Sequence, residues 1–554
     1  MNFKTFLKGA YLLMLMAMTC VSAHAGNISA TTAQQVANRF LKHRMCNAPG
    51  AFKSVSLSDI QLSHAEPSSV EAGAIDYYVF NINGGGFIII AGEDRAEQVL
   101  GYDDKGRFDV NNLPDPLRDL LDNYKRGIEF LQTHKGQAIT QPRRILGQTA
   151  GGIEPMTKTE WGQEMPYYTQ NPMKNGKYSK VGCAGAAMLQ MCYFWKYPIS
   201  CGPLPGYYAS RLSDTVPALP GTTFDYRNML LSYGYWDWDA TQLVQGEYTD
   251  EQALAVATLA RYCSQAALMN FSPDVSTTNE AAKLNGMKTL GYNTNAISIN
   301  NFGNTYTTEQ WDSLLRVELD AGRPVMYASD KPGKVGHAFI IDGYNDEGYF
   351  HINMGWYSTN NGWYLTTAIV LISRYDAYRD YSEYNRMIRF LEPPLYCILE
   401  CDGVEASNDL YVLGDTFLPT AKNVWLNTSY RTVDLGFTLT DSDGHPVATG
   451  DNMTVQRHLF EQECDVCCGI VLPTTLSDGK YQVQFNCCAA DSLLATGGIA
   501  PDELTVVGKF AKYGKRFDVA DVSTVINYVL QGTPKNVKLD VGDIAMLINH
   551  ILQS

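Results

Sequence analysis

The chain has 554 residues, of which 45% are hydrophobic and 18% are charged, and its formal net charge at pH 7 is −15. This length is too great for a single core and indicates three or four domains, while the hydrophobic share excludes global disorder. An acidic chain without a lysine- or arginine-rich stripe argues against a nucleic-acid or anionic-membrane partner.

The first 25 residues have the pattern of an export signal. Two lysines precede an apolar stretch from Ala10 to Val21, and small residues favour cleavage after Ala25. The stretch is shorter than the roughly 20 residues that span a bilayer, and no later segment is long and apolar enough to do so. We therefore expect residues 1–25 to be a signal peptide and the mature protein to be soluble and secreted, either extracellular, periplasmic or at the cell surface.

Residues 26–144 are expected to fold as one unit of helices and strands. Helices are predicted over 31–43 and 113–132, and the alternating run 76–91 predicts a strand, a turn and a second strand. The turn is Gly84-Gly85-Gly86. It lacks the following helix and the Lys-Ser/Thr of a phosphate loop, which favours a hairpin turn.

A polar linker follows this unit. Residues 135–152 include Arg143-Arg144 and are typical of a protease-sensitive connection.

Residues 145–394 are expected to form a second, mixed domain. Helices are predicted over 184–197 and 249–267, and strands over 324–328, 337–344 and 348–353. After Pro393-Pro394 the pattern changes to short alternating runs. These favour a β-sandwich-like module over 395–507.

The tail, residues 508–554, contains an internal repeat. Residues 517–531 match residues 539–553, and each copy has acidic residues at the start of an apolar helical pattern. Two such copies resemble a dockerin module, but only over the helices. Lysine-containing segments stand where a dockerin carries its calcium loops, so calcium binding is not expected. The C-terminal modules are candidates for binding a protein or a surface.

Cys183 is the strongest candidate for a nucleophile. In Val181-Gly-Cys-Ala-Gly-Ala-Ala187 a glycine delivers Cys183 to the start of a predicted helix with small residues in its first turn. Backbone N–H groups and the helix dipole at this position lower the pKa of a thiol. This segment alone leaves open that Cys183 is a buried structural cysteine, as we expect Cys192 to be.

A cysteine nucleophile needs a base, and His337 and His351 are the two histidines between Cys183 and Pro394. His337 follows a glycine-containing loop and begins an apolar strand, which can hold a base rigidly at the edge of a cleft. His351 lies in the next strand and is the alternative base. We predict His337 as the base and His351 as a hydrogen-bonded structural residue.

Two further polar residues complete the predicted site. Asn353 can orient the imidazole of His337 through its amide oxygen, if adjacent strands bring the two together. The side chain of Gln163 can stabilise the oxyanion beside the backbone N–H of Cys183. The alternatives are a polar turn or core residue for Asn353 and a surface glutamine for Gln163.

Neither a metal nor a cofactor is expected. The chain has no His-Glu-x-x-His motif. Cys464, Cys467, Cys468, Cys487 and Cys488 could be drawn as a zinc site, but thiols or disulfides are the commoner state of such residues in an exported β module.

Several segments share the motifs of one protease family. They are Trp161-Gly-Gln163, Gly182-Cys-Ala184, Gly336-His-Ala-Phe-Ile-Ile-Asp-Gly343, His351-Ile-Asn-Met-Gly-Trp356 and, near the front, Tyr77-Tyr-Val-Phe-Asn81 and Gly86-Phe-Ile-Ile-Ile-Ala-Gly-Glu-Asp-Arg95. The first four resemble the streptopain family of papain-like cysteine proteases. The last two resemble that family's inhibitory propeptide.

The resemblance implies an α+β protein with an inhibitory propeptide at 26–144 and a papain-like catalytic domain at 145–394. It implies Cys183 and His337 as the catalytic pair, Gln163 in the oxyanion hole and Asn353 as the residue that orients the histidine. The substrates would be proteins or peptides, cut by an endopeptidase with a hydrophobic preference at the second residue before the cut. We predict that cleavage within 143–158 releases the propeptide.

One residue departs from the family pattern. Met354 stands where family members commonly have tryptophan, whose indole would shield the orienting hydrogen bond of the histidine from water. Two other functions stay open at this point. One is a papain-like acyltransferase or amidase, and the other is a surface-binding or adhesion protein with a decayed protease domain.

Overall fold

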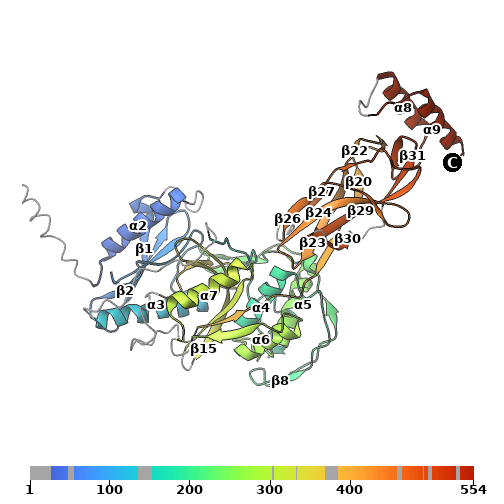
Figure 1. Cartoon of the computed structure of the whole chain (residues 1–554). Helices are drawn as coiled ribbons and strands as arrows, with labels where there is room; N and C mark the ends of the chain where they lie inside the picture. Colours follow the sequence, from blue (N-terminus) through green and yellow to red (C-terminus); the bar gives the residue numbers. More distant parts are fainter. Residues whose placement is uncertain are drawn as a thin grey trace, which may run out of the picture. The chain divides into compact units, whose positions relative to one another are not determined.

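The computed structural model describes ten stretches of the chain: 26–47, 55–134, 152–301, 305–331, 334–367, 385–457, 464–490, 492–496, 502–531 and 537–553. The expected signal peptide and Arg143-Arg144 lie outside the described residues. The chain divides into two compact units, Met1–Glu392 and Pro393–Ser554 (Figure 1). Among the described residues, no helix is both long enough and apolar enough to span a bilayer.

One ten-stranded sheet runs through the first unit. In spatial order its strands are β1 (Ile60–Pro67), β2 (Ile75–Ile82), β3 (Phe87–Ala91), β4 (Val99–Asp103), β17 (Gly362–Tyr364), β16 (Phe350–Asn353), β15 (Lys334–Tyr344), β14 (Val325–Lys331), β18 (Asn385–Arg389) and β13 (Ile297–Asn300). The predicted hairpin at 76–91 is confirmed as β2 and β3. The first four strands come from the expected propeptide and the other six from the expected catalytic domain.

The two ranges join where β4 pairs antiparallel with β17. Tyr102 lies opposite Trp363, and Gly101 lies opposite Tyr364. A Cβ atom at Gly101 would lie 2.4 Å from Cδ1 of Tyr364, so only glycine permits this approach. The propeptide range thus extends the sheet of the catalytic range.

Helices cover both faces of the sheet. In Figure 1, α2 (Ala30–Asn47) and α3 (Asp115–Thr133) lie on opposite sides of β1 and β2. The predicted helices at 31–43 and 113–132 are thereby confirmed. Helix α7 (Thr308–Asp320) contributes to the same core as α3.

Helix α3 ties the two ranges together. Its buried side chains recur at helical spacing and share a core with both ranges of the sheet: Leu117, Leu121, Tyr124, Ile128 and Leu131. The hydroxyl of Tyr124 lies 2.9 Å from the carbonyl oxygen of Leu100 and 2.6 Å from that of Leu365, one on each side of the junction.

Helix α4 (Cys183–Trp195) packs against β15, and α5 (Asp250–Ala266) and α6 (Glu280–Thr289) pack beside it. Helix α4 ends earlier than predicted because Lys196 takes a left-handed conformation with φ of 49° and Pro198 follows. The predicted helix at 249–267 is confirmed as α5, which begins with a capping box between Thr249 and Gln252.

Short strands form additional two-stranded ladders. They are β5 (Met173–Lys174) with β6 (Lys177–Tyr178), β7 (Ser200–Cys201) with β10 (Thr222–Thr223), β8 (Tyr207–Ala209) with β9 (Asp214–Val216), β11 (Gly234–Asp237) with β12 (Gln242–Gln245), and β22 (Thr416–Phe417) with β28 (Ile470–Val471).

The second unit contains two packed sheets, and they extend past the expected end at residue 507, because the strand Phe510–Tyr513 belongs to one of them. One sheet comprises β19 (Cys397–Glu400), β23 (Pro419–Thr428), β20 (Gly403–Ala406) and β27 (Cys464–Cys467). The other comprises β21 (Leu410–Val412), β32 (Phe510–Tyr513), β31 (Asp502–Val507), β29 (Gly479–Ala489), β24 (Thr432–Thr440), β25 (Pro446–Thr449), β26 (Met453–Gln456) and β30 (Ser492–Thr496). Both sheets bury apolar residues in one shared core.

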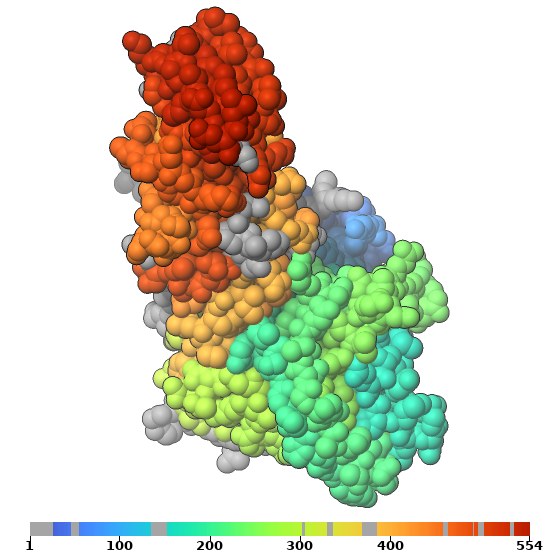
Figure 2. Space-filling model, turned by 90° about the vertical axis from the view of Figure 1, so that its right-hand side faces the viewer, coloured from blue at the N-terminus to red at the C-terminus, as the bar shows by residue number. Residues whose placement is uncertain are grey.

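The predicted repeat forms two helices, α8 (Val519–Gln531) and α9 (Val541–Gln553), at one end of the sandwich (Figure 1); their residues are the dark red surface at the top of Figure 2. Each helix places an acidic residue in its first turn against a lysine. Lys512 Nζ lies 2.7 Å from Asp521 Oδ1, and Lys509 Nζ lies 3.1 Å from Asp543 Oδ2. Lys512, from one of the segments that make calcium binding unexpected, is thus an ion-pair partner of the repeat.

We predict that Lys512→Met destabilises the second unit. Lys512 and Asp521 are only 5% and 6% exposed, so the change leaves a buried carboxylate without its counter-charge. The expected loss is about 3 kcal/mol in the free energy of unfolding of this unit. Pulse proteolysis of the full chain in urea, with fragments identified by mass, measures it.

The control is Lys515→Met, because Lys515 and Asp409 form a 2.8 Å pair whose side chains are 64% and 49% exposed. That change should leave the urea midpoint where it is. Equal effects of the two substitutions would contradict the prediction.

Candidate active site

Cys183 lies at the first position of α4, half-buried, and the rest of that helix is buried. Gly182 delivers the chain to this position with φ of +80°. A Cβ atom there would lie 2.8 Å from the carbonyl oxygen of Ser276, so both the backbone angle and the space require glycine. The glycine turn predicted from the sequence therefore fixes where the thiol stands.

The thiol of Cys183 is hydrogen-bonded to His337, and the backbone N–H of Ala338 lies 3.5 Å from Sγ. Burial raises the pKa of Cys183, but the bond to His337, its charge, the Ala338 N–H and the charge of Lys283 outweigh burial. The net result is a lowered pKa for this thiol. The structure thus brings the predicted nucleophile and base together.

His337 also faces two carboxylates of α3. Its Nε2 lies 3.9 Å from Asp119 Oδ2 and 4.0 Å from Asp115 Oδ2. Burial lowers the pKa of His337, but Cys183 and then the charges of Asp119 and Asp115 raise it above its ordinary value. Shifts in these two directions favour a thiolate beside an imidazolium.

Gln163 is positioned by its neighbours in sequence. Trp161 is buried and donates its indole N–H to the carbonyl oxygen of Leu230 at 2.8 Å. Gly162 lies against Tyr357, where a Cβ atom would come within 2.3 Å of the ring. The carbonyl oxygen of Gln163 accepts from the N–H of Val181 at 3.1 Å, which links it to the segment that leads into Cys183.

Asn353 makes no hydrogen bond to His337 within the described part of the chain. Its amide nitrogen donates to Thr157 Oγ1 at 3.2 Å and to the carbonyl oxygen of Thr159 at 2.9 Å, and its oxygen accepts from the N–H of Gly355 at 3.1 Å. The sheet register explains the difference from the expected contact, because Asn353 lies opposite Ile340 on β15. His337 lies three residues before Ile340, and side chains three residues apart on a strand point to opposite faces of the sheet.

His351 is bonded as a structural residue. Its Nδ1 lies 2.6 Å from Oδ1 of Asp342, which is fully buried, and its ring packs edge-on against Trp363. Asp342 also accepts from the backbone N–H of Thr157 at 2.8 Å and from its hydroxyl.

The same network holds the start of the catalytic range. Ile153 and Tyr344 exchange backbone hydrogen bonds of 2.7 and 2.9 Å, and Met156 N–H donates to the carbonyl oxygen of Asp342 at 3.0 Å. The part of the expected cleavage region from Ile153 onward is therefore paired with β15. Cleavage there would disturb the backbone hydrogen bonds that hold this segment to β15.

Met354, the departure from the family pattern, is 1% exposed and belongs to the core under α3. Its backbone N–H donates to Oδ1 of Asn361 at 2.8 Å. The neighbouring tryptophan, Trp356, packs against the same core and lines a cavity together with Gln163.

The cysteines considered for zinc do not gather. Cys464 and Cys467 are exposed, whereas Cys468 and Cys487 are buried in the sandwich core. Cys487 Sγ instead lies 3.3 Å from Cys397 Sγ.

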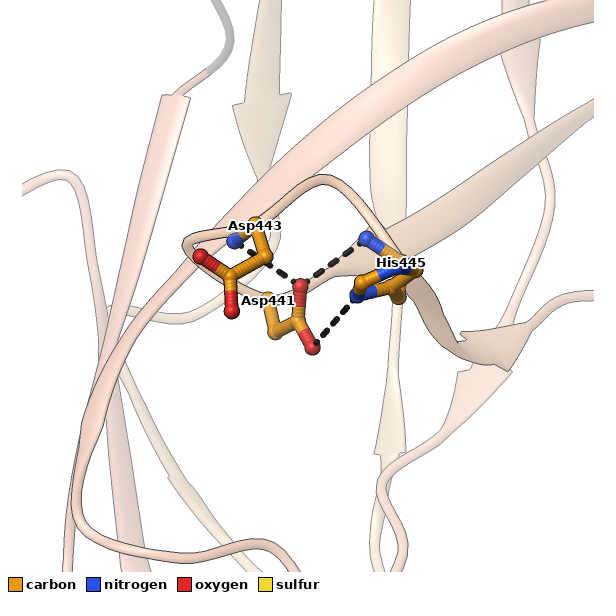
Figure 3. Close-up of side chains that lie close together, drawn as sticks. All are labelled: Asp441, Asp443 and His445. Carbon is orange, nitrogen blue, oxygen red and sulfur yellow. Dashed lines mark hydrogen bonds and ion pairs between the residues drawn. The ribbon is translucent and has the colours of Figure 1, made fainter.

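Within the described ranges, the group of potential metal ligands found is Asp441, Asp443 and His445. Figure 3 shows them in the turn between β24 and β25. Asp441 Oδ1 accepts from the backbone N–H groups of Asp443 at 3.0 Å and His445 at 2.8 Å, which is the bonding of a capped turn. The turn accounts for the cluster without a metal.

Sequence reasoning missed Asp115 and Asp119 as residues of the site. Both lie on the predicted helix at 113–132. Asp115 is in its first turn, where an acidic residue is equally well explained by its favourable interaction with the helix dipole. Their position opposite His337 depends on how α3 docks on the sheet, which no local pattern encodes.

Comparisons with known proteins find related sequences. Residues 161–364 match the Peptidase C10 family, and residues 25–128 match the Spi protease inhibitor family. The thiol protease/hemagglutinin PrtT of Porphyromonas gingivalis is 27% identical over 361 residues, which cover 62% of this chain and 39% of that protein. Streptopain of Streptococcus pyogenes serotype M28 is 25% identical over 325 residues, covering 54% and 76%.

Among solved structures, a fragment of prointerpain A from Prevotella intermedia aligns over 60% of this chain and 98% of the fragment, with 25% identity and a TM-score of 0.48. The chain spans 39% of the length of PrtT, so the likeness to that protein concerns a part of it. The range that holds Cys183 and His337 thus matches the Peptidase C10 family model, and the range ahead of it matches the Spi protease inhibitor model.

Proposed function

We propose that the chain is a secreted cysteine endopeptidase made as a zymogen. The observation that carries this proposal is the Cys183 thiol at the N-terminus of α4, hydrogen-bonded to His337, with opposite pKa shifts on the two groups. This pairing supplies a nucleophile and a proton carrier in one contact.

The reaction is acyl transfer to the thiol. The Cys183 thiolate attacks the peptide carbonyl, and the N–H of Cys183 and the side chain of Gln163 stabilise the oxyanion. His337 protonates the leaving amine and then takes a proton from the water that releases the acyl-enzyme. Asn353 serves as a positioning residue in this proposal, since its bonds fix Thr157 and Thr159 beside the catalytic sheet.

Two features support latency in the precursor. The Asp115 and Asp119 carboxylates of α3 stand next to His337, in space that a substrate must reach. The pairing of β4 with β17 and the Tyr124 hydroxyl hold that helix in place. We infer that residues 26–144 act as the chain's own inhibitor until a cut upstream of Ile153 releases them.

The remaining expectations belong to the same proposal. Residues 1–25 direct export, and the substrate carries a hydrophobic residue two positions before the cut. The tail is a dockerin-like helical pair whose first-turn acids are neutralised by Lys512 and Lys509. It is a candidate for holding the enzyme to a protein or a surface.

We predict that casein hydrolysis by the purified full-length chain rises as the chain shortens, and that E-64 abolishes it. Cys183→Ala should reduce the rate by at least about a thousandfold, because no other group replaces the thiol. Cys192→Ala is the matched control, since that buried cysteine lies on the same helix. Equal hydrolysis by Cys183→Ala would contradict the proposal.

We predict that His337→Ala raises the pKa of Cys183, because burial persists while the hydrogen bond and charge of His337 are lost. At pH 7 the rate of iodoacetamide modification of Cys183 should fall by about tenfold or more. Mass spectrometry of the Cys183 peptide measures it, with exposed Cys464 as the internal reference. An unchanged pH profile would show that the two groups do not interact.

We predict that Asp119→Asn shortens the lag before self-activation by about threefold to tenfold, because it removes one charge that attracts His337. The raised pKa of His337 means that this attraction is complete below pH 6.5 and is lost as the pH rises through the raised value. The difference between variant and parent should therefore be large at pH 6 and small at alkaline pH.

The control is Asp122→Asn, an exposed carboxylate on the same helix. If both substitutions shorten the lag equally, the effect comes from the general charge of α3 rather than from His337.

A further inference from the structure

A cavity of about 330 Å³ lies between the catalytic range and the residues that lead into α3. On the catalytic side its walls include Gln163, Trp236, Leu243 and Trp356. Trp236 and Leu243 come from the β11–β12 hairpin. Neither the predicted catalytic machinery nor the family motifs of this chain include that hairpin.

The residues that line the cavity place it on the leaving-group side of the scissile bond. Asp115 lines the cavity, and its carboxylate lies 4.0 Å from Nε2 of His337. Gln163, the proposed oxyanion donor, lines it as well. In the proposed reaction His337 delivers a proton to the leaving amine, so the leaving group lies beside His337. The cavity is bounded by Asp115, next to His337, and by Gln163, and we therefore place it on the leaving-group side.

The hairpin presents a matched pair of side chains to this space. Trp236 lies directly opposite Leu243 in the antiparallel register, so both project from the same face of the hairpin. Tyr235 and Val244 are the neighbouring pair and project from the other face, where Tyr235 is 56% exposed.

The chemistry of the walls favours an apolar occupant. Trp236, Leu243, Trp356 and Tyr357 supply three aromatic rings and one aliphatic chain. The two charged residues on the catalytic side neutralise each other: Lys180 Nζ lies 2.8 Å from Glu164 Oε1.

In the precursor a propeptide segment sits against this space. Leu113 and its neighbour Asn112 line the cavity, and Leu113 is only 6% exposed. The guanidinium of Arg118 holds the segment by donating to the carbonyl oxygens of Leu113 at 3.2 Å, Asn111 at 3.3 Å and Val110 at 3.4 Å. The precursor therefore places an apolar residue of its own, Leu113, at the wall of this cavity.

We propose that Trp236 and Leu243 of the β11–β12 hairpin form, with Trp356, the pocket that selects a large apolar side chain on the leaving-group side of the cut. The inference rests on the proposed endopeptidase function and assigns specificity to that same site. It adds a second selected position to the one expected before the cut.

The test uses the self-matured enzyme and internally quenched peptides that differ only at the first and second residues after the cut. These carry Phe, Leu, Gly or Asp, and enzyme concentrations are set by E-64 titration. Trp236→Ala should lower kcat/KM for the Phe peptides by about tenfold or more and for the Gly peptides by about twofold at most. Tyr235→Ala should behave as the parent enzyme with every peptide.

Leu243→Lys provides a gain of function that a folding defect cannot imitate. Leu243 is half-exposed, so a lysine fits there, and its charge should raise kcat/KM for the Asp peptides relative to the Phe peptides by about tenfold. Equal losses for all peptides in Trp236→Ala, together with an unchanged preference in Leu243→Lys, would overturn the inference. A parent enzyme that neither binds E-64 nor cleaves any peptide would instead overturn the proposed function.

Discussion

The first unit depends on the register of strand β15, because one face of this strand packs into the core under α3 and the other packs against α4. Phe339 and Ile341 point into the core under α3, whereas alternate residues face α4. His337 precedes both and meets Cys183 from α4 and Asp119 from α3 at one end of the strand. A slip of one residue in the register of β15 would exchange its faces and separate the thiol from its base.

The same packing joins catalysis to its restraint. Helix α3 shares a core with the sheet that carries His337 and also carries the carboxylates beside this histidine, so the proposed inhibition needs no further structural element. A consequence of this packing is that the proposed cut upstream of Ile153 does not by itself free the cleft. The strands β1–β4 and helix α3 remain bound through a buried core and a shared strand pair until they dissociate together.

The residues with local signals were predictable, and those that depend on long-range register were not. Cys183 follows a glycine at a helix start, and His337 opens an apolar strand, so each is visible in a few residues of sequence. The partner of Asn353 depends on which residue of β15 it faces, and the structure puts Ile340 there. The β4–β17 pairing joins segments more than 250 residues apart, and two expected domains therefore proved to share one sheet. Gln163 was predicted because a glutamine side chain can donate a hydrogen bond to an oxyanion. The β11–β12 hairpin, which lines the same cavity, carries no sequence motif.

The β4–β17 junction has a consequence if residues 26–144 are released as proposed. When β1–β4 leave, the outer edge of β17 loses its partner, and its N–H and C=O groups face water. That edge is three residues long and carries Trp363, so release of the segment would expose a short strand edge that can pair with another chain. In the proposed zymogen, residues 26–144 thus cover the outer edge of β17 in addition to placing carboxylates beside His337.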